Sequence, residues 1–264
     1  MTASNVTGTL EKNESLVIPT TSSKEELLAH LAKIRPAGGW RHLIHFSNGV
    51  KTSDVEKAKP WSDAPLNKIK MVERKIPGFA KRGGRALDIG CNIGYNSLYL
   101  ADAYDMDVLG IDVTEGQMVV CREFAKLCGK TNARFELKNA ETYREPNAFD
   151  LIVHFGTLYH LRNPILALES ASKNLKIGGV LALETQCHGA RGGDIARYVR
   201  GFKGDVSNWW ALGDGSLKKI LQFCGFGEIQ EVFHWTSPLL DGMYRIIWVM
   251  KKEREIEAAY DDKG

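Results

Sequence analysis

The residues of this chain best suited to chemistry lie in the stretch 87–97, LDIGCNIGYNS, where an apolar run ends in Asp88 and glycines follow at positions 90 and 94. Glycines in such a loop let the backbone approach a ligand closely. A phosphate-binding loop requires GxxxxGK[ST], which does not occur at this turn. The dinucleotide fingerprint requires GxGxxG, but Asn92 and Tyr95 occupy its second and third glycine positions. The pattern therefore argues against a triphosphate and against a pyrophosphate here.

A second acid, Asp112, ends the next apolar run in the stretch LGIDVT. A carboxylate at the end of a second strand can accept hydrogen bonds from both hydroxyls of a ribose. An acid also stands at this point in nicotinamide enzymes, and Asp112 is placed to cap the helix that EGQMVV begins. A ribose-binding role and a capping role are both open for this residue.

Polar side chains also follow the fourth and fifth expected strands, whose carboxyl ends should face a ligand. Tyr159 and His160 come after the fourth strand, and Glu184, Gln186 and His188 come at the end of the fifth. Because an imidazole titrates near neutral pH, His160 is a candidate general base, with a turn cap as the alternative. His188 is a candidate catalytic or substrate contact, and Glu184 either contacts substrate or pairs with a backbone amide.

Residues 187–213 form a long insertion after the fifth strand, and loops of this length in a compact domain are usually functional or disordered. Its cations and aromatic residues suit an anionic or flat substrate through charge pairing and stacking. The alternative is a solvated cationic face over packed tryptophans. The expected substrate contacts are Glu184, Arg191, Arg197, Tyr198, Trp209 and Trp210.

The elements that must position these residues alternate from residue 85 onward. Short apolar runs predict strands at 85–91, 107–113, 133–141, 149–158 and 179–186. Helical patterns lie between them, and the helix over 163–179 has Pro164 near its start and Gly178 at its end. This alternation predicts a parallel sheet covered on both faces. His154, inside the fourth strand, is expected to be a satisfied core residue.

The end of the chain breaks this alternation. Residues 228–235 and 244–252 both have strand composition, and the gap between them is too short for a helix. The two strands should therefore pair antiparallel. The expected fold is α/β, with a mostly parallel seven-stranded sheet and an antiparallel C-terminal hairpin.

The segments outside this sheet are expected to form a cap and two tails. Residues 1–23 look like a flexible arm, and residues 24–84 form a helical cap with Ser23 as N-cap, a turn at Asn48-Gly49 and a helix from about Pro65. The main domain spans residues 85–252, with the insertion as its lid, and residues 253–264 form a tail.

The composition is that of an ordinary globular protein, with 264 residues, 44% of them hydrophobic, and a net charge of +3. That charge is modest for a dedicated nucleic-acid binder, so a small-molecule partner is favoured. The five cysteines form no CxxC pair, so reduced thiols and a cytoplasmic location are expected, without a metal site. No signal peptide or membrane-spanning run is apparent, and a homodimer stays open.

The pattern Asp88-x-Gly90-x-Asn92-x-Gly94 resembles motif I, D/E-x-G-x-G-x-G, of the class I S-adenosylmethionine-dependent methyltransferases. Asn92 replaces the middle glycine, and asparagine tolerates left-handed backbone better than most residues. The resemblance implies a Rossmann-like fold, with the loop near the methionine part of the cofactor and Asp88 near its ammonium group. It places the adenine against Asn139, Ala140 and Glu141. It places Phe155 in the region under the sulfonium.

Further stretches resemble one branch of this family, that of the tRNA wobble-uridine carboxymethyltransferase and its small-molecule relatives. They are GTLYHLRNP (156–164), LALETQCHG (181–189), GSLKKILQFCGF (215–226) and the early HLIHFSNGVKT. That enzyme uses a carboxylated cofactor, gripped partly by a lysine before motif I that the sequence alone does not single out. Tyr159 matches a tyrosine of the grip, but LYH also occurs in relatives that use the ordinary cofactor.

The resemblance implies in-line methyl transfer from S-adenosylmethionine to a small molecule, with S-adenosylhomocysteine as product. Oxygen is the expected acceptor atom, with carbon and nitrogen as alternatives, and secondary metabolism is the expected setting. The expected catalytic residues are Tyr159, His160 and His188. A tRNA-modifying enzyme, a binding protein without turnover and a nicotinamide oxidoreductase are the competing hypotheses.

Overall fold

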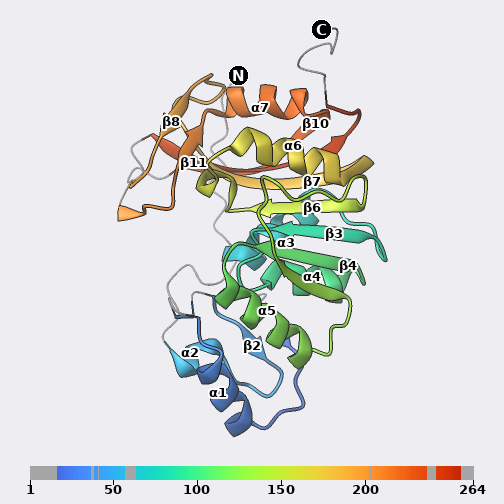
Figure 1. Cartoon of the computed structure of the whole chain (residues 1–264), viewed down its shortest axis with the longest axis vertical. Coiled ribbons are helices and arrows are strands. Elements are labelled where there is room, and N and C mark those ends of the chain that lie inside the picture. The colour runs from blue at the N-terminus through green and yellow to red at the C-terminus, as the bar shows by residue number, and fades with distance from the viewer. Residues whose placement is uncertain are drawn as a thin grey trace.

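The structure is a computed structural model that describes residues 17–36, 39–40, 42–56, 64–201, 204–236 and 242–256, with only the backbone for 64–67. The expected arm over residues 1–16 and the last tail residues, 257–264, lie outside this range. The first half of the chain contains the N-terminal elements and the first three strands of the main sheet, which alternate with helices from β3 onward as expected (Figure 1). They are β1 (Val17–Ile18), α1 (Lys24–Lys33), β2 (His45–Phe46), α2 (Thr52–Val55), α3 (Ala64–Lys75), β3 (Arg85–Ile89), α4 (Tyr95–Ala103), β4 (Asp107–Asp112), α5 (Glu115–Leu127) and β5 (Ala133–Leu137).

The second half of the chain supplies the rest of the sheet and the helices of its other face. These elements are β6 (Phe149–Phe155), the 3₁₀ turn η1 (Leu158–His160), α6 (Pro164–Asn174), β7 (Leu175–His188), β8 (Ala196–Tyr198), β9 (Trp210–Leu212), α7 (Asp214–Phe223), β10 (Phe226–Thr236) and β11 (Met243–Lys252).

The main sheet follows the strand order β10-β11-β7-β6-β3-β4-β5. The pairs from β7 to β5 are parallel, whereas β11 is antiparallel to both β7 and β10. The expected fold class, including the antiparallel C-terminal pair, is therefore confirmed. The strand order reverses between β3 and β6, and a ligand of such a sheet binds at the carboxyl ends beside that point.

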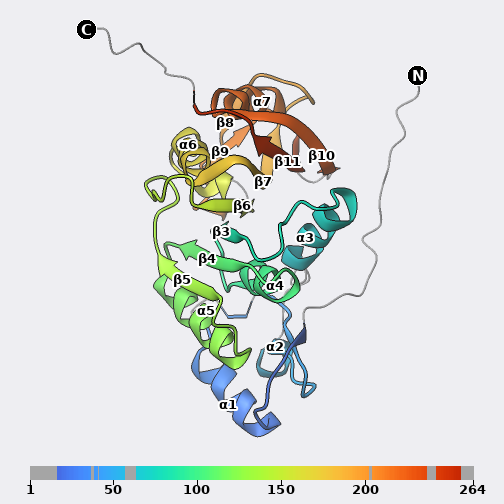
Figure 2. The same ribbon diagram turned by 90° about the vertical axis from the view of Figure 1, so that its right-hand side faces the viewer.

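Helices cover both faces of the sheet, as Figure 2 shows along its edge. One cluster of buried residues joins α3, α4 and α5 to Ala86, Val108 and Val153 on one face. The other joins α6 and α7 to Leu87, Leu109 and Ile152 on the opposite face. Because side chains alternate along each strand, Asp88 and Glu184 belong to the α3–α4 face.

The N-terminal segment packs on α5 rather than on the sheet. Trp40 stacks on Phe124 with ring centroids 5.6 Å apart, and Phe46 meets the same ring edge-on. Ser23 and Glu26 form the expected capping box of α1. Within the expected arm, residues 17–18 form β1 and pair parallel with β2.

The helix α6 ends earlier than its sequence pattern predicts. Pro164 is in its first turn, as expected, but the helix stops at Asn174 and Gly178 lies inside β7 with φ of +79°. Asn174 is buried and its side chain bonds the backbone of Tyr143 and Glu145, so it joins this corner to the preceding loop. Leu175 already pairs with Phe149 of β6.

The insertion is partly built into the sheet. Strand β7 runs past the end of β6, and β9 pairs with it in parallel at Cys187 and Leu212. Strand β8 then pairs antiparallel with β9, so the main sheet has nine strands where seven were expected. The segment expected as a loop thus continues the sheet beyond the carboxyl end of β6.

Candidate functional site

The loop after β3 has the backbone that its glycines predict. Gly90, Asn92 and Gly94 all have positive φ, at 69°, 53° and 79°. A Cβ on Gly90 would lie 2.0 Å from Oγ1 of Thr157, so the first position accepts no side chain. Asn92 takes the left-handed conformation expected of the residue that replaces the middle glycine. The loop is thus shaped by its backbone and leads directly into α4.

Asp112 ends β4 opposite this loop and is partly buried. Its carboxylate accepts hydrogen bonds from the backbone N–H of Asn92 at 3.2 Å and of Thr114 at 3.0 Å. In the orientation that satisfies its partners, the amide of Gln117 also lies 3.2 Å from both carboxylate oxygens. Thr114, not Asp112, is the N-cap of α5. A carboxylate has about four lone-pair sites and the two backbone N–H groups take two of them, so it accepts from two ribose hydroxyls only where these displace the amide of Gln117.

Asp88 lies at the end of β3 but is buried within the sheet–helix interface, with 1% of its surface exposed. The hydroxyl of Ser97 donates to it at 2.6 Å. Burial raises its pKa to about 7, although the hydrogen bonds from Ser97 act in the opposite direction. This carboxylate therefore supports the loop from beneath and joins it to α4.

The expected adenine residues lie in the turn after β5. Asn139 accepts a hydrogen bond from the backbone of Glu141 at 2.8 Å, and Ala140 is buried against the α6 face. The carboxylate of Glu141 accepts from the backbone of Asn163 at 2.9 Å, which joins this turn to the start of α6. Phe155 ends β6 and is 8% exposed. These four residues lie at or just after the carboxyl ends of β5 and β6, and the β3 loop lies at the carboxyl end of β3 in the same parallel sheet.

A charged cluster on the α3–α4 face stands out from the rest of the interior. Glu184 is 1% exposed, and its two oxygens bind Lys68 Nζ at 2.8 Å and Arg245 Nη1 at 2.6 Å. Arg245 Nη2 also donates to the hydroxyl of Tyr159 at 3.0 Å. Gly156 lies beside the cluster. Because it has no side chain, the polar ends of Glu184, Lys68 and Tyr159 lie close to its backbone. We call Lys68, Tyr159, Glu184 and Arg245 the Glu184 cluster.

The Glu184 cluster keeps its charges. Burial raises the pKa of Glu184, but the charges of Lys68 and Arg245 lower it by more. The net pKa is below the ordinary value, so the carboxyl is ionised. Burial lowers the pKa of Arg245, but Glu184 and Tyr159 raise it above its ordinary value. Two cations against one carboxylate leave one net positive charge beside a phenol hydroxyl. Such a group is suited to bind one anionic oxygen-rich group of a ligand.

Two members of this cluster were not singled out by sequence analysis. Lys68 lies 20 positions before Asp88 in a helix, and Arg245 lies in the last strand. Lys68 is a lysine before motif I, the feature expected of the carboxymethyltransferase, which the sequence alone did not single out. Glu184 pairs with these side chains, not with a backbone amide. A charged residue inside an otherwise apolar strand, as in YRIIWVM, was the available signal for Arg245.

His154 was expected to be a satisfied core residue, and only its burial is confirmed. It is fully buried, and neither ring nitrogen has a hydrogen-bond partner among the described residues. Burial lowers its pKa to about 4, so the ring is neutral. It projects from β6 on the face opposite to Glu184, away from the Glu184 cluster.

Strand β7 carries Gln186 and His188 beyond Glu184 on the same face. Nε2 of His188 lies 2.7 Å from Nη1 of Arg197, which comes from β8. Arginine has only donors, so His188 accepts at Nε2 and is neutral in this pair. The structure therefore brings two expected ligand contacts together at the far end of β7.

Other charged and aromatic residues of the insertion divide into two groups. Arg191 forms ion pairs with Asp214 at 3.1 Å and with Glu231. It therefore links the insertion to α7 and β10 of the main domain. The rings of Trp209 and Trp210 lie 6.2 Å and 5.5 Å from Tyr198, which is half exposed. The guanidinium groups of Arg162 and Arg200 lie 5.0 Å and 4.1 Å from the Trp209 ring.

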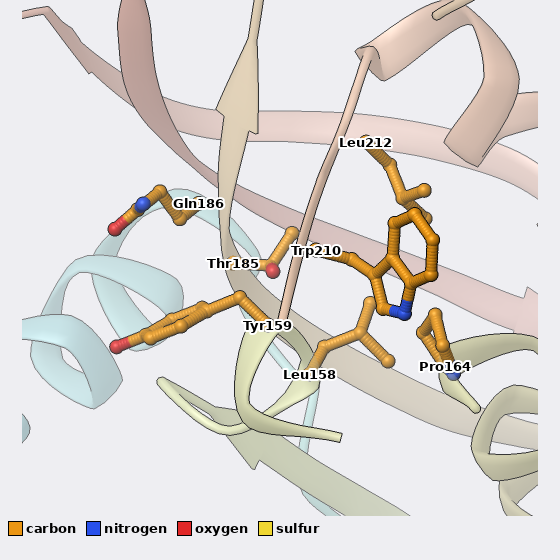
Figure 3. A pocket seen from close by; sticks show the side chains of 7 residues that line it. All are labelled: Leu158, Tyr159, Pro164, Thr185, Gln186, Trp210 and Leu212. Carbon is orange, nitrogen blue, oxygen red and sulfur yellow. The ribbon is translucent and has the colours of Figure 1, made fainter. Parts of the chain in front are cut away.

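A shallow pocket is lined by Trp210 of the insertion and by Tyr159 of the Glu184 cluster (Figure 3). It is lined by Leu158, Tyr159, Pro164, Thr185, Gln186, Trp210 and Leu212. In Figure 3 the polar ends of Tyr159 and Gln186 point to the side opposite Trp210 and Leu212. The polar ends of these two side chains thus point away from the apolar side chains of Trp210 and Leu212.

The described residues contain neither a candidate metal site nor a candidate membrane-spanning helix. No group of three or more histidine, cysteine or acidic side chains in the described ranges could hold a metal ion. Within the same ranges, no helix has the length and apolar character needed to cross a bilayer.

Comparisons with known proteins agree with this geometry. Residues 87–181 match the family described as Methyltransferase domain. A phosphoethanolamine N-methyltransferase of Triticum aestivum is 30% identical over 152 residues, which are 56% of this chain but 29% of the relative. A tRNA U34 carboxymethyltransferase of Idiomarina loihiensis is 26% identical over 215 residues, 75% of this chain and 66% of the relative. The chain thus spans less than a third of the plant relative.

A solved structure extends the likeness over nearly the whole chain. The N-terminal domain of EvdMO1, crystallised in the presence of SAH and D-fucose, superposes with a TM-score of 0.68 at 21% identity. The alignment covers 88% of this chain and 97% of that one. Together the strand order, the β3 loop, the family match and the relatives give this chain the class I methyltransferase fold and a likeness to S-adenosylmethionine-dependent methyltransferases, among them the tRNA U34 carboxymethyltransferase.

Proposed function

We propose that this chain binds S-adenosylmethionine and transfers its methyl group directly to a small molecule that carries an anionic group. The Glu184 cluster carries this proposal, since it leaves one uncompensated positive charge at the carboxyl end of β7. The wheat relative is named for phosphoethanolamine, a small molecule with a phosphate. Oxygen is the proposed acceptor atom, and the plant relatives make nitrogen the first alternative.

The residues of the β3–β4 edge fit the proposed cofactor. The left-handed turn over 90–94 suits the amino-acid part, and the fixed carboxylate of Asp112 suits the ribose hydroxyls. When bound, the cofactor supplies a methyl carbon activated by its sulfonium. The protein then has to align the acceptor, exclude water and remove a proton where the acceptor carries one. Tyr159 and Arg245 would hold the anionic group, and the insertion would cover it.

Calorimetric titration tests the proposal directly. S-adenosylmethionine and S-adenosylhomocysteine should both bind, and NAD should not. A panel of small phosphorylated and carboxylated alcohols and amines should then give methylated product by mass spectrometry. Binding of neither nucleoside would refute the proposed function, and binding without any methylated product would favour a protein without turnover.

A second candidate is carboxymethyl transfer to tRNA, favoured by the position of Lys68. In that case the Glu184 cluster would hold a carboxylate on the cofactor itself. The variant Lys68→Met separates the two. Under the second function it weakens binding of carboxylated S-adenosylmethionine and spares the ordinary cofactor. Under the first it spares both cofactors and raises the KM for the anionic acceptor.

A further inference from the structure

His160 lies at the end of η1, next to Tyr159 of the Glu184 cluster. Its ring is 4.2 Å from that of Tyr159, and it is partly buried. The charges of Asp205 in the insertion, Arg245 and Asp112 all act on it. The imidazole is therefore within electrostatic reach of the proposed ribose carboxylate and of the proposed anion site.

A short chain of hydrogen bonds joins this imidazole to the insertion. The hydroxyl of Ser207 donates to Asp205 Oδ1 at 2.5 Å, and the backbone N–H of Ser207 donates to the same oxygen at 2.9 Å. Oγ of Ser207 lies 3.0 Å from Nδ1 of His160. A hydroxyl has one proton, and an ionised carboxylate can only accept, so that proton is committed to Asp205. Ser207 must then accept from His160, which places the imidazole proton on Nδ1.

The backbone of the insertion holds Ser207 at this position. Trp209 donates its N–H to the carbonyl of Tyr159 at 2.8 Å, and its own carbonyl accepts from Val199 at 2.9 Å. The indole of Trp210 donates to the carbonyl of Arg162 at 3.0 Å. Asn208, between Ser207 and Trp209, is buried. Residues 207–210 are therefore docked on the turn that carries His160.

We infer that Ser207 and Asp205 are positioning residues that hold His160 with a proton on Nδ1 and a lone pair on Nε2, so that Nε2 removes the proton of the methyl acceptor. The inference rests on the proposed function. The acceptor atom forms its bond to the methyl carbon as the bond from that carbon to the donor sulfur breaks, and the electron pair of the broken bond goes to sulfur. The proton of the acceptor moves to Nε2, and the ring becomes an imidazolium. The positive charge that forms is stabilised through Ser207 by the carboxylate of Asp205.

The charges around His160 agree with this role. Burial lowers the pKa of His160 and Arg245 acts in the same direction, whereas a backbone hydrogen bond of Ser207 and the charges of Asp205 and Asp112 raise it. The net effect is a pKa below the ordinary value, so the ring is neutral at pH 7 and can accept a proton. Removing the charge of Asp205 should lower this pKa further.

Nuclear magnetic resonance of the free protein tests the geometry without any substrate. Long-range proton–nitrogen correlation distinguishes the two imidazole tautomers, and the signals of His160 are assigned by their loss in His160→Gln. We expect the Nδ1–H tautomer in the wild type and in Ser207→Thr, which keeps the hydroxyl. Ser207→Ala should shift the ring toward the Nε2–H tautomer. Asp205→Asn should lower the pKa of His160.

A second measurement ties the tautomer to the reaction. In Asp205→Asn the acidic limb of the kcat/KM profile should move to lower pH, while the affinity for S-adenosylmethionine measured by calorimetry stays unchanged. An Nε2–H tautomer in the wild type, or an unchanged tautomer in Ser207→Ala, would overturn the inference. If the tautomer is as expected but the protein binds no S-adenosylmethionine, the proposed function fails and the proton-acceptor role fails with it. An expected tautomer and normal cofactor affinity without a shift in the acidic limb would overturn the catalytic part alone.

Discussion

The two halves of the ligand crevice are built by different means. At the β3–β4 edge, Gly90, Asn92 and Gly94 shape the loop through their backbone conformation. At the β6–β7–β11 edge, the Glu184 cluster is shaped by the charges of side chains from α3, η1, β7 and β11. The first half is encoded by neighbouring residues, and the second depends on residues up to 177 positions apart, Lys68 and Arg245. The halves should therefore fail under different substitutions.

Neutralising the buried charge should have the largest effect and should damage only the second half. Glu184→Gln leaves Lys68 and Arg245 facing each other without a counter-charge. Breaking a buried pair of this kind costs about 3–5 kcal/mol in the free energy of unfolding. Urea denaturation measures it, with Glu145→Gln as the matched control. Glu145 pairs with Arg85 in a half-exposed position, where about 1 kcal/mol or less is expected.

Adding one methyl group should damage the first half. In Gly90→Ala the new Cβ would overlap Thr157 at a φ of +69°, and left-handed strain and overpacking together should cost about 2–4 kcal/mol. Gly83→Ala is the matched control, because its φ is +70° but no atom lies within 4 Å of its Cβ. Thermal unfolding and calorimetry with S-adenosylmethionine would measure the difference. Equal losses in the two variants would show that space at Gly90 is unimportant.

The carboxylate at the end of β4 should govern cofactor affinity more than stability. Asp112→Asn keeps one acceptor oxygen for the backbone of Asn92 but removes the charge. Hydrogen bonds to charged groups contribute about 1.5–3 kcal/mol, so the affinity for S-adenosylmethionine should fall about 10- to 100-fold. Asp107→Asn, at the other end of the same strand, should leave the affinity unchanged. Undiminished affinity in Asp112→Asn would remove the ribose assignment.

The last effect should appear in the pH dependence of stability. Burial raises the pKa of Asp88 in the folded protein to about 7, so between about pH 4 and pH 7 the folded state holds a proton that the unfolded state has lost. This contribution is fully present below the unfolded pKa and is lost as the pH rises toward 7, by up to about 1.4 kcal/mol per pH unit. Asp88→Asn should remove that slope from denaturation curves measured at pH 4.5–7. An unchanged slope would show that Asp88 titrates normally.

The contrast between the halves also explains what the sequence could predict. The parallel sheet, the C-terminal pair, the left-handed Asn92 and the acid at Asp112 follow from local patterns of glycine, charge and alternation. The ion pairs of Glu184 do not, since no local pattern shows that Lys68 and Arg245 meet. The early end of α6 was missed because Gly178 looks like a helix stop, whereas it lies inside a long strand.

The residues of the insertion were predicted by type but not by partner. Arg191 is bound to two acids, while Arg197 meets His188, and charge alone does not separate these outcomes. His154 was placed in the core correctly, but its two nitrogens are left unpartnered among the described residues. The partners of these side chains come from distant parts of the chain. The spacing of residues along the sequence does not show which distant residues meet.

The pairing of β9 with β7 has a consequence for how such enzymes change substrates. The insertion leaves the fold at Cys187 and returns at Leu212, and these two residues are cross-strand neighbours. Adjacent strands are about 5 Å apart, so the segment between them has closely spaced ends. A segment of this kind can be exchanged between homologues as one cassette, without altering the length or register of the strands that carry the methyl donor. Under the proposed function, the cover of the acceptor can then change in this segment while the strands that carry the donor stay as they are.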